Sequence, residues 1–471
     1  MKIKLKKFTE FSKRILPNEA NYLASVHRFV DEEKIRIIEQ VIENALSPHQ
    51  FKNFDTTYDK RKYTYVKNWI KRKLTAIDVD KTTDRLMALK KKILTDAITP
   101  AEEKQFLQYI SNYKKVNYNF QNLYELAKEY RPYLLIRMRY KDHQTVAVFL
   151  ANFELHYDKT IKIQEQLYTA TVEITNQYTL NNNETRYWEK WLLKVFETLE
   201  IDGRNRYQAF ILLAFMYTNY NENTKLKLIF DKIDEFFSRG QMYSRRLLSN
   251  YYASRVLMHS KQNELTKAEY YGFLSIRQNN DDTLMYLNNL AAILLKNDKP
   301  KQAFSLLETY RELYTTTHNY HQKIGYASYQ IRALTELRQE RLAESRARHF
   351  LKKYKSEVLK HRWHHFFTSY IGVLITLEKY MEVLKLAGKF NLKEKEKERR
   401  KKSNYVPNIS WSISLSKYME GKISESKLTT EMKEPLNGIS PTENQKQLML
   451  QVMNKLSRNL PEAFLQLKSH I

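Results

Sequence analysis

The sequence predicts an all-α protein: an α-solenoid of antiparallel helix pairs with a helical N-terminal region. Three observations favour this fold class. Helix-breaking residues are scarce, signals of helix N-termini recur, and a helix-pair pattern returns every 35 to 40 residues in the second half of the chain. Only eight glycines and nine prolines occur among 471 residues, and no glycine precedes Gly203. We therefore expect helices joined by short polar links, and no sheet.

The shortage of glycine also bears on function. Loops that cradle phosphates and turns that expose a catalytic serine need backbone conformations that glycine adopts most easily. A chain with so few glycines is expected to contain few turns of positive φ. Cysteine is absent, so no thiolate nucleophile or thiolate metal ligand is possible. We predict a protein that is not an enzyme and needs no cofactor.

One histidine cluster has the spacing of a metal-binding helix face. His361, His364 and His365 lie three and four residues apart, and imidazoles at i and i+4 can share a zinc ion. No carboxylate follows closely in the sequence to orient them. We interpret the cluster as an aromatic-rich helix start that packs on its neighbour, and we predict no bound metal.

The composition is that of a folded, basic protein. Hydrophobic residues make up 42% of the chain and aromatic residues 13%, enough for a large core. Lys and Arg outnumber Asp and Glu by 80 to 53, for a net charge of +27. No apolar run is long enough to cross a membrane, and no apolar segment follows the basic start at residues 1–7. We expect a soluble, cytoplasmic protein that does not bind membranes.

Residues 1–200 carry helix signals without a clear repeat period. Asp31 precedes a run of helically spaced apolar residues from Ile35 to Ala45, which predicts a capped helix. The tetrapeptide 99–102, Thr-Pro-Ala-Glu, has the pattern of a capping box with proline in the first turn. Residues 132–140 could form a strand, but we expect a short helix because no partner strand is evident. The region is either a set of divergent repeats or a separate helical domain.

Residues 204–390 carry the repeat. Residues 283–295 and 301–310 have the pattern of two helices joined by a polar turn. Ala303 opens the second helix, and Leu307 follows four residues later. Small residues let antiparallel helices approach closely, while large residues fill the space between pairs. Short apolar residues recur at comparable places, at Ala268, Ala343 and Val383.

This pattern resembles the tetratricopeptide repeat (TPR), a family of helical hairpins. Leu290 and Ala291 match the large and small positions of the family's first helix, and Ala303, Leu307 and Tyr310 match those of its second helix. The spacing here is longer than in the family, and the family's tryptophan and proline are missing. The resemblance implies a TPR-like right-handed superhelix in which the first helix of each pair lines a concave binding face.

Two segments follow the repeats. Residues 391–403 are rich in Lys, Arg and Glu and predict a charged linker or helix extension. Residues 404–471 predict a C-terminal helical cap. Within it we expect helices at 440–456 and 461–470, each after a capping signal.

The resemblance directs the search for a site to polar residues of the first helices. Asn and Arg side chains there can hydrogen-bond the backbone or the carboxylates of an extended peptide. The candidate residues are Arg246, Asn250, Asn288, Asn289, Tyr329 and Arg332. We predict a scaffold or adaptor that binds a protein or peptide partner.

A nucleic-acid-binding helical-repeat protein is the alternative. Residues 60–92 mix basic residues with Tyr and Trp, a combination that can neutralise phosphates and stack on bases. The candidate residues are Lys67, Trp69, Lys71, Arg72 and Lys73. A solvated amphipathic helix explains the same pattern, and any binding to nucleic acid is then expected to be weak.

Overall fold

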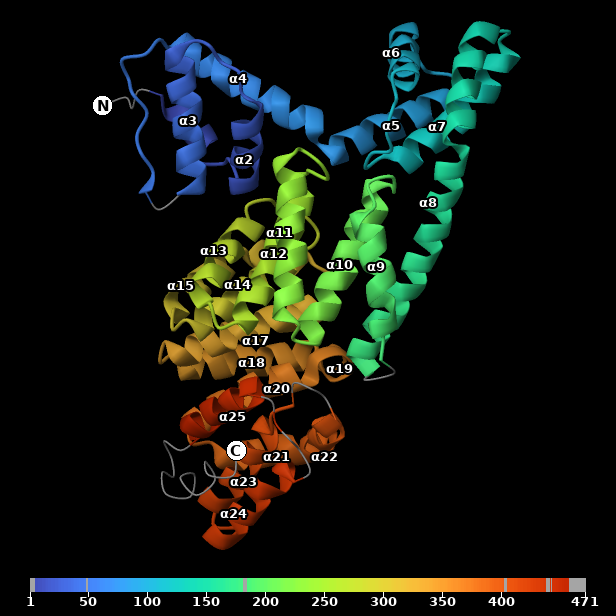
Figure 1. Ribbon diagram of the computed structural model, residues 1–471. Helices are drawn as coiled ribbons and strands as arrows, with labels where there is room; N and C mark the ends of the chain where they lie inside the picture. The colour runs from blue at the N-terminus through green and yellow to red at the C-terminus, as the bar shows by residue number, and fades with distance from the viewer. Residues whose placement is uncertain are drawn as a thin grey trace. The chain divides into compact units, whose positions relative to one another are not determined.

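The computed structural model describes residues 5–47, 50–180, 184–401, 405–437, 441 and 443–456. Every regular element in these ranges is a helix, and no strand occurs among them (Figure 1). Most helices pack against helices close to them along the chain, as in a solenoid of helix pairs. The predicted all-α fold class is therefore confirmed. The right-handed superhelical sense stays a prediction.

The chain divides into two compact units, residues 1–254 and 255–471, and the division lies within α12 (Arg245–Lys261). The boundary expected between residues 200 and 204 lies inside the first unit. The physical reason is that the N-terminal helix α2 packs on α11, which belongs to the first helix pair of the predicted repeats.

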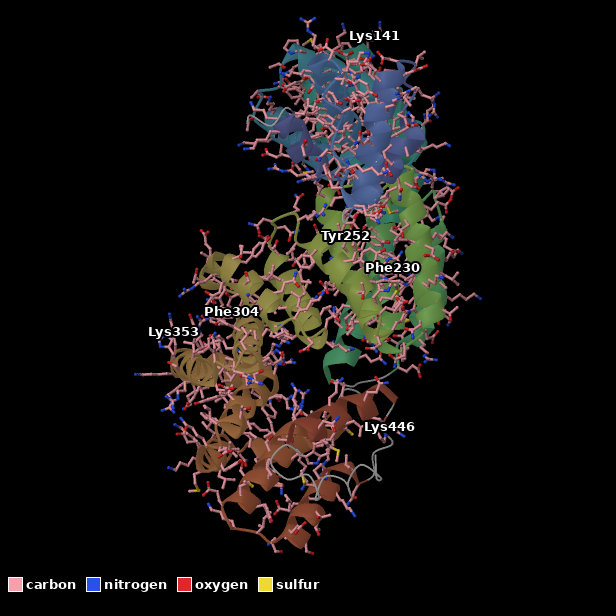
Figure 2. All side chains as sticks on the ribbon, turned by 90° about the vertical axis from the view of Figure 1, so that its left-hand side faces the viewer. Lys141, Phe230, Tyr252, Phe304, Lys353 and Lys446 are labelled. Carbon is pink, nitrogen blue, oxygen red and sulfur yellow. The ribbon has the colours of Figure 1, made fainter. Side chains whose placement is uncertain are left out.

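The first unit contains the helices up to α11 and the start of α12. Phe230 and Tyr252, both labelled in Figure 2, are buried in its core, each about 1% exposed. Its elements are α1 (Lys6–Ser12), α2 (Pro17–Val26), α3 (Glu32–Leu46), α4 (Lys60–Ile77), α5 (Val79–Leu94), α6 (Pro100–Ser111), α7 (Phe120–Ile136), α8 (Tyr140–Leu180), the short turn η2 (Arg186–Trp188), α9 (Glu189–Glu197), α10 (Gly203–Asn219) and α11 (Asn223–Ser238).

A buried carboxylate fastens the N-terminal helices to the start of α12. Glu19 is fully buried and accepts a hydrogen bond from the backbone N–H of Leu16, which closes the first turn of α2. The same carboxylate pairs with the guanidinium of Arg245 (2.8 Å) and accepts from the hydroxyl of Tyr243 (2.6 Å). Because a buried charge is tolerated only when it is paired and hydrogen-bonded, this cluster holds distant segments together.

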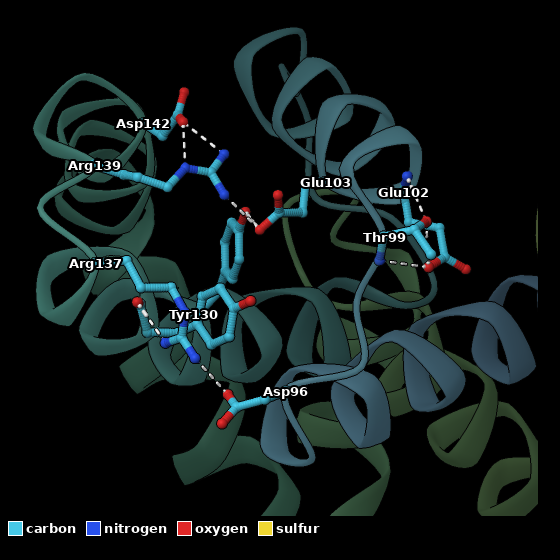
Figure 3. Close-up of polar contacts among 9 residues, drawn as sticks. Asp96, Thr99, Glu102, Glu103, Tyr130, Arg137, Arg139 and Asp142 are labelled. Atoms are coloured by element: carbon cyan, nitrogen blue, oxygen red, sulfur yellow. Dashed lines mark hydrogen bonds and ion pairs between the residues drawn. The ribbon is translucent and has the colours of Figure 1, made fainter.

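Polar contacts also tie α6, α7 and α8 together (Figure 3). Arg139 donates to Glu103 (2.6 Å), and the hydroxyl of buried Tyr130 donates to the same oxygen (3.0 Å). Residues 132–136 belong to α7, and α8 begins at Tyr140 after a tight turn. The segment 132–140 is therefore helical, as expected, although a turn interrupts it. The predicted capping box of Thr99 and Glu102 is confirmed at the start of α6.

The second unit continues the helix pairs. After the remainder of α12, its elements are α13 (Leu265–Ser275), α14 (Thr283–Lys296), α15 (Pro300–Thr309), α16 (Arg311–Thr316), α17 (Tyr320–Glu336), α18 (Glu340–Lys353), α19 (Lys355–Glu357), the π-helical turn η3 (Val358–Arg362), α20 (Trp363–Thr376), α21 (Tyr380–Phe390), α22 (Leu392–Lys397), the turn η4 (Glu398–Lys401), α23 (Asn408–Met419), α24 (Glu425–Lys433), η5 (Glu434–Leu436) and α25 (Glu443–Leu456).

The repeat has a constant register in its second helices. The fourth residue of each of these helices is buried, with at most 1% of its surface exposed. These residues include all four that the sequence singled out, and the full set is Leu226, Ala268, Ala303, Ala343, Val383 and Leu428. In four of the six helices this side chain is short, Ala or Val, which allows the first and second helices to cross closely.

The turns within the helix pairs contradict the expectation that residues of positive φ are few. The first helices end in a left-handed residue at Asn221, Asn263, Asp298, Arg338 and Glu378, with φ between 55 and 59°. The next backbone N–H then bonds back to the last helical turn at 2.8–2.9 Å, as in a Schellman motif. Turns of positive φ are therefore frequent despite the scarcity of glycine. Asn and Asp tolerate this conformation, whereas Arg and Glu adopt it at a cost.

The charged segment 391–403 forms α22 and a 3-10 turn in its described part. It is not solvated throughout, because Leu392 and Glu396 are fully buried. In the predicted cap, α23 and α24 form a further pair, and α25 covers part of the predicted helix at 440–456. The helix predicted at 461–470 and its capping residue Asn459 lie outside the described residues.

Candidate functional site

The first helices of three consecutive pairs lie side by side in the second unit. The helix α17 packs against α14 on one side and α20 on the other. Residues spaced three and four apart on α17 fall on one side of that helix. We call the surface that they form with their neighbours the first-helix face. It comprises Asn288, Gln322, Gly325, Tyr329, Arg332, Arg362, His365 and Thr368.

Gly325 leaves room on this face for the ends of the Arg362 and Asn288 side chains. A Cβ atom at this position would lie 2.7 Å from Nη1 of Arg362 and 3.0 Å from Nδ2 of Asn288. Both distances are too short for a carbon atom in ordinary contact. Glycine is thus required so that the Arg362 side chain can reach across α17, where it donates to the carbonyl of His321 (3.4 Å).

Several buried polar atoms on this face have no protein partner. Asn288 is 3% exposed and donates through Nδ2 to the carbonyl and side chain of Gln322, at 3.0 and 3.1 Å. Its Oδ1 accepts no hydrogen bond from the described residues, and Nε2 of His365 and Oγ1 of Thr368 are equally unpartnered. Since buried polar atoms are usually satisfied, this concentration indicates a surface built to take up polar groups.

The face is electropositive. Neither Arg332 nor Arg362 forms an ion pair with any residue that the structure describes. Burial, with the charges of Arg362 and Arg332, holds the pKa of His365 well below its usual range. Burial and the charge of Arg362 also lower the pKa of His321. The two guanidinium groups are therefore the fixed charges, and the buried imidazole of His365 is neutral at pH 7.

The histidine cluster found in the sequence is divided between two environments. Nε2 of His364 lies 3.1 Å from Oε1 of Glu396, whereas the ring of His365 lies edge-on to that of Tyr329 with 4.9 Å between centroids. Within the described ranges, no three His, Asp or Glu side chains are placed to hold a metal ion.

Three of the candidate peptide-binding residues meet on the first-helix face, namely Asn288, Tyr329 and Arg332. Asn289 lies beside Asn288 on α14 and is partly exposed. Arg246 and Asn250 belong to the first unit and are engaged there. Arg246 forms a bidentate ion pair with Asp80 at 2.8 and 3.1 Å, and Asn250 accepts from the hydroxyl of Tyr207 (3.1 Å).

Sequence reasoning missed Gly325, Arg362 and Thr368. The signal that could have found them is the helical spacing of polar and small residues from 322 to 332, repeated from 362 to 368. Arg362 was missed because it precedes α20, in a π-helical turn for which the sequence carries no recognisable signal.

Several basic residues of α4 expose their charged side chains to solvent. Lys71 and Arg72 are exposed, and Lys60 and Arg61 at the start of the same helix are exposed as well. None of these four side chains forms an ion pair among the residues described. They form an unpaired basic surface on one side of the helix, which we call the α4 basic face.

Trp69, the aromatic residue of α4 among the candidates, is not available for stacking, although Tyr65 on the same helix is 49% exposed. Trp69 is only 7% exposed, and its ring packs on Phe29 with 4.8 Å between centroids. Nζ of Lys73 lies over the Trp69 ring at 5.9 Å, and Nζ of Lys67 lies over Phe11 at 5.5 Å. Base stacking on Trp69, which the nucleic-acid hypothesis invoked, therefore has no exposed ring face to use.

No protein-family model, curated protein or solved structure matches the chain. The TPR resemblance thus rests on the residues alone. Within the described part of the chain, no helix has the length and apolar character to span a bilayer.

Proposed function

We propose that this protein is a non-catalytic, TPR-like scaffold that binds an extended acidic segment of a partner protein along the first-helix face. The observation that carries the proposal is the pair Arg332, on the first helix α17, and Arg362, in the turn that leads into the first helix α20; neither guanidinium has a carboxylate partner among the described residues. A guanidinium forms strong bidentate hydrogen bonds with carboxylates, so side-chain carboxylates of the partner would occupy them.

The unpartnered polar atoms support a peptide rather than a compact ligand. These atoms have almost no exposed surface, so a partner reaches them only when side chains on the face move aside; Oδ1 of Asn288 can then accept a backbone N–H, and the hydroxyl of Thr368 can donate to a carbonyl. Asn288, Arg332 and Thr368 come from the first helices of three successive pairs, α14, α17 and α20, and Arg362 comes from the turn before α20. Helices packed side by side lie about 8–10 Å apart, so the groups are spread along a line that an extended segment can follow.

The proposal is tested by fluorescence anisotropy with a labelled (Glu-Gly)5 peptide and the full-length protein. We expect measurable binding to the acidic peptide and none to (Gln-Gly)5. Arg332→Gln and Arg362→Gln should each weaken binding about tenfold, because a hydrogen bond to a charged group contributes about 1.5–3 kcal/mol.

The matched control is Arg341→Gln, which removes the same charge from an exposed site on the second helix α18. It should leave the affinity within about twofold of the parent. If the Arg332→Gln/Arg362→Gln double variant binds the acidic peptide as tightly as the parent does, the first-helix face is not the site.

A nucleic-acid-binding role is the second candidate, and the α4 basic face favours it. Exposed, unpaired Lys and Arg side chains release counterions when they neutralise phosphates, so log affinity falls linearly with log salt. Because Trp69 is buried, stacking is left to the half-exposed ring of Tyr65, and we expect only a small preference for single strands.

This candidate is tested by measuring the salt dependence of binding to a duplex. Replacing Lys67, Lys71, Arg72 and Lys73 with Gln should reduce the slope by roughly 0.9 for each phosphate that these side chains neutralise in the parent. Tight binding with an unchanged slope in this variant would place any nucleic-acid site elsewhere on the protein.

A further inference from the structure

A cleft of about 460 Å³ lies between α16, α17 and α18 in the second unit. Each of the three helices contributes residues to its lining. The spacing from Ala303 to Ala343 is five residues longer than that from Ala268 to Ala303, and the longer repeat contains the additional helix α16. The cleft is thus a product of the irregular repeat.

The charged residues that line the cleft are all basic. Arg311 comes from α16, while Arg346, His349 and Lys353 come from α18, and no acidic side chain lines it. The nearby carboxylate of Glu308 pairs with Arg346 at 2.8 Å. Arg311 and Lys353 form no ion pair with any described residue. Two cations, one from α16 and one from α18, are therefore left without a counter-charge.

A buried lysine adds to this positive charge. Lys323 is 6% exposed, and Nζ lies 5.4–5.8 Å from the ring centroids of Tyr314, Tyr320 and Tyr354. Two of these rings, those of Tyr314 and Tyr354, line the cleft. A lysine buried without a carboxylate is uncommon, and its charge lies behind the rings where an anion in the cleft would benefit from it.

The cleft also offers aromatic surface. Tyr314 stacks on Tyr326 with 4.5 Å between centroids, and both line the cleft together with Tyr354. The residues Phe304 and Lys353, labelled in Figure 2, mark α15 and α18 in this part of the unit, and Arg346 lies over the Phe304 ring at 5.5 Å. Cations and rings thus converge from three helices.

We propose that this cleft binds a phosphate monoester, carried either by a small molecule or by a phosphorylated side chain. A phosphate monoester carries nearly two negative charges at pH 7 and can accept hydrogen bonds from Arg311 of α16 and Lys353 of α18. A carboxylate offers a single charge and fewer acceptor oxygens. The tyrosine rings provide the apolar contact for the group that bears the phosphate.

The test is isothermal titration calorimetry of the full-length protein with phenyl phosphate. We expect phenyl phosphate to bind about tenfold more tightly than benzoate and than inorganic phosphate, because it combines the dianion with a ring. Arg311→Gln and Lys353→Gln should each weaken binding about tenfold. Both side chains are exposed, so the variants should melt at the parent's temperature.

Lys352→Gln is the matched control, since Lys352 is an exposed neighbour of Lys353 that does not line the cleft. It should leave the affinity unchanged. Absence of binding to phenyl phosphate, or equal binding by the Arg311→Gln/Lys353→Gln double variant, would overturn the proposal.

A second arm distinguishes the two sources of the phosphate. A Gly-Gly-phosphotyrosine-Gly-Gly peptide that binds more tightly than phenyl phosphate indicates a phosphorylated side chain, and weaker binding indicates a small molecule. The cleft shares no residue with the first-helix face. Arg332→Gln and Arg362→Gln should therefore leave phenyl phosphate binding unchanged, so the two proposals can fail separately.

Discussion

Oε2 of Glu396 lies 2.6 Å from both the backbone nitrogen and the hydroxyl of Ser410, in the first turn of α23. Its other oxygen accepts from the backbone N–H of Ile409 at 3.0 Å. The carboxylate thus satisfies N–H groups that have no partner within their own helix, and its charge is favourable at a helix N-terminus. The contact fastens α22 to α23.

We predict that Glu396→Ala destabilises the protein by about 1–3 kcal/mol, because it leaves buried N–H groups without an acceptor. Urea denaturation would measure the loss. Glu394→Ala, at an exposed site on the same short helix, should change the free energy of unfolding by less than about 0.5 kcal/mol. Equal effects of the two substitutions would show that the cap contributes nothing.

Ala303→Leu should overpack the pair formed by α14 and α15. Ala303 is fully buried, and α15 packs against both α14 and α17. A larger side chain there forces the helices apart, at a cost of about 1–3 kcal/mol. Thermal melting would detect this cost, and the exposed neighbour Gln302→Leu serves as the control. A variant that melts like the parent would contradict the close crossing.

Glycine should stabilise the turns that now hold Arg338 and Glu378. Their φ values of 58 and 57° cost a residue with a side chain about 1–2 kcal/mol. We expect Arg338→Gly and Glu378→Gly each to raise the free energy of unfolding by about 1 kcal/mol. This value allows for the larger conformational entropy that glycine loses on folding. The control Arg338→Ala keeps a Cβ atom at the left-handed position and should not raise the free energy of unfolding. Destabilisation at both turns would contradict the left-handed conformation.

Asp202 should make stability depend on pH. Its buried carboxylate caps α10 through the backbone N–H groups of Arg204 and Asn205, at 2.9 and 3.2 Å, and burial raises its pKa to about 6. The folded state therefore binds this proton more tightly than the unfolded chain does. The resulting stabilisation is present below about pH 4 and is lost as the pH rises through 6.

Asp202→Asn keeps an oxygen acceptor and removes the charge. The stability of the variant relative to the parent should therefore increase between pH 4 and pH 7, by at most about 3 kcal/mol. Denaturation at pH 4, 6 and 8 would measure the change. If the parent instead gains stability relative to the variant as the pH rises, then the favourable interaction of the charged carboxylate with the helix N-terminus outweighs the cost of burying it.

Much of the helical architecture could be predicted from the sequence because its signals are local. The capping box at Thr99 depends on residues three positions apart, and the register of Ala303 and Leu307 depends on one turn of helix. Such patterns act within a single helix or helix pair. The same reasoning predicted Asn288, Tyr329 and Arg332 as candidate site residues, and the three residues do share one face. Their role in binding stays a prediction.

Only the tertiary structure decided which side chains are available on the surface. Trp69 is buried against Phe29, and Arg246 is paired with Asp80, which lies 166 residues away in the chain. Glu396, which belongs to a charged run in the sequence, became a buried cap because α22 meets the start of α23. Helical periodicity states which side of a helix is apolar, but not which other helix covers it. The burial and pairing of these polar and aromatic side chains depend on contacts between distant segments, and those contacts form only when the whole chain folds.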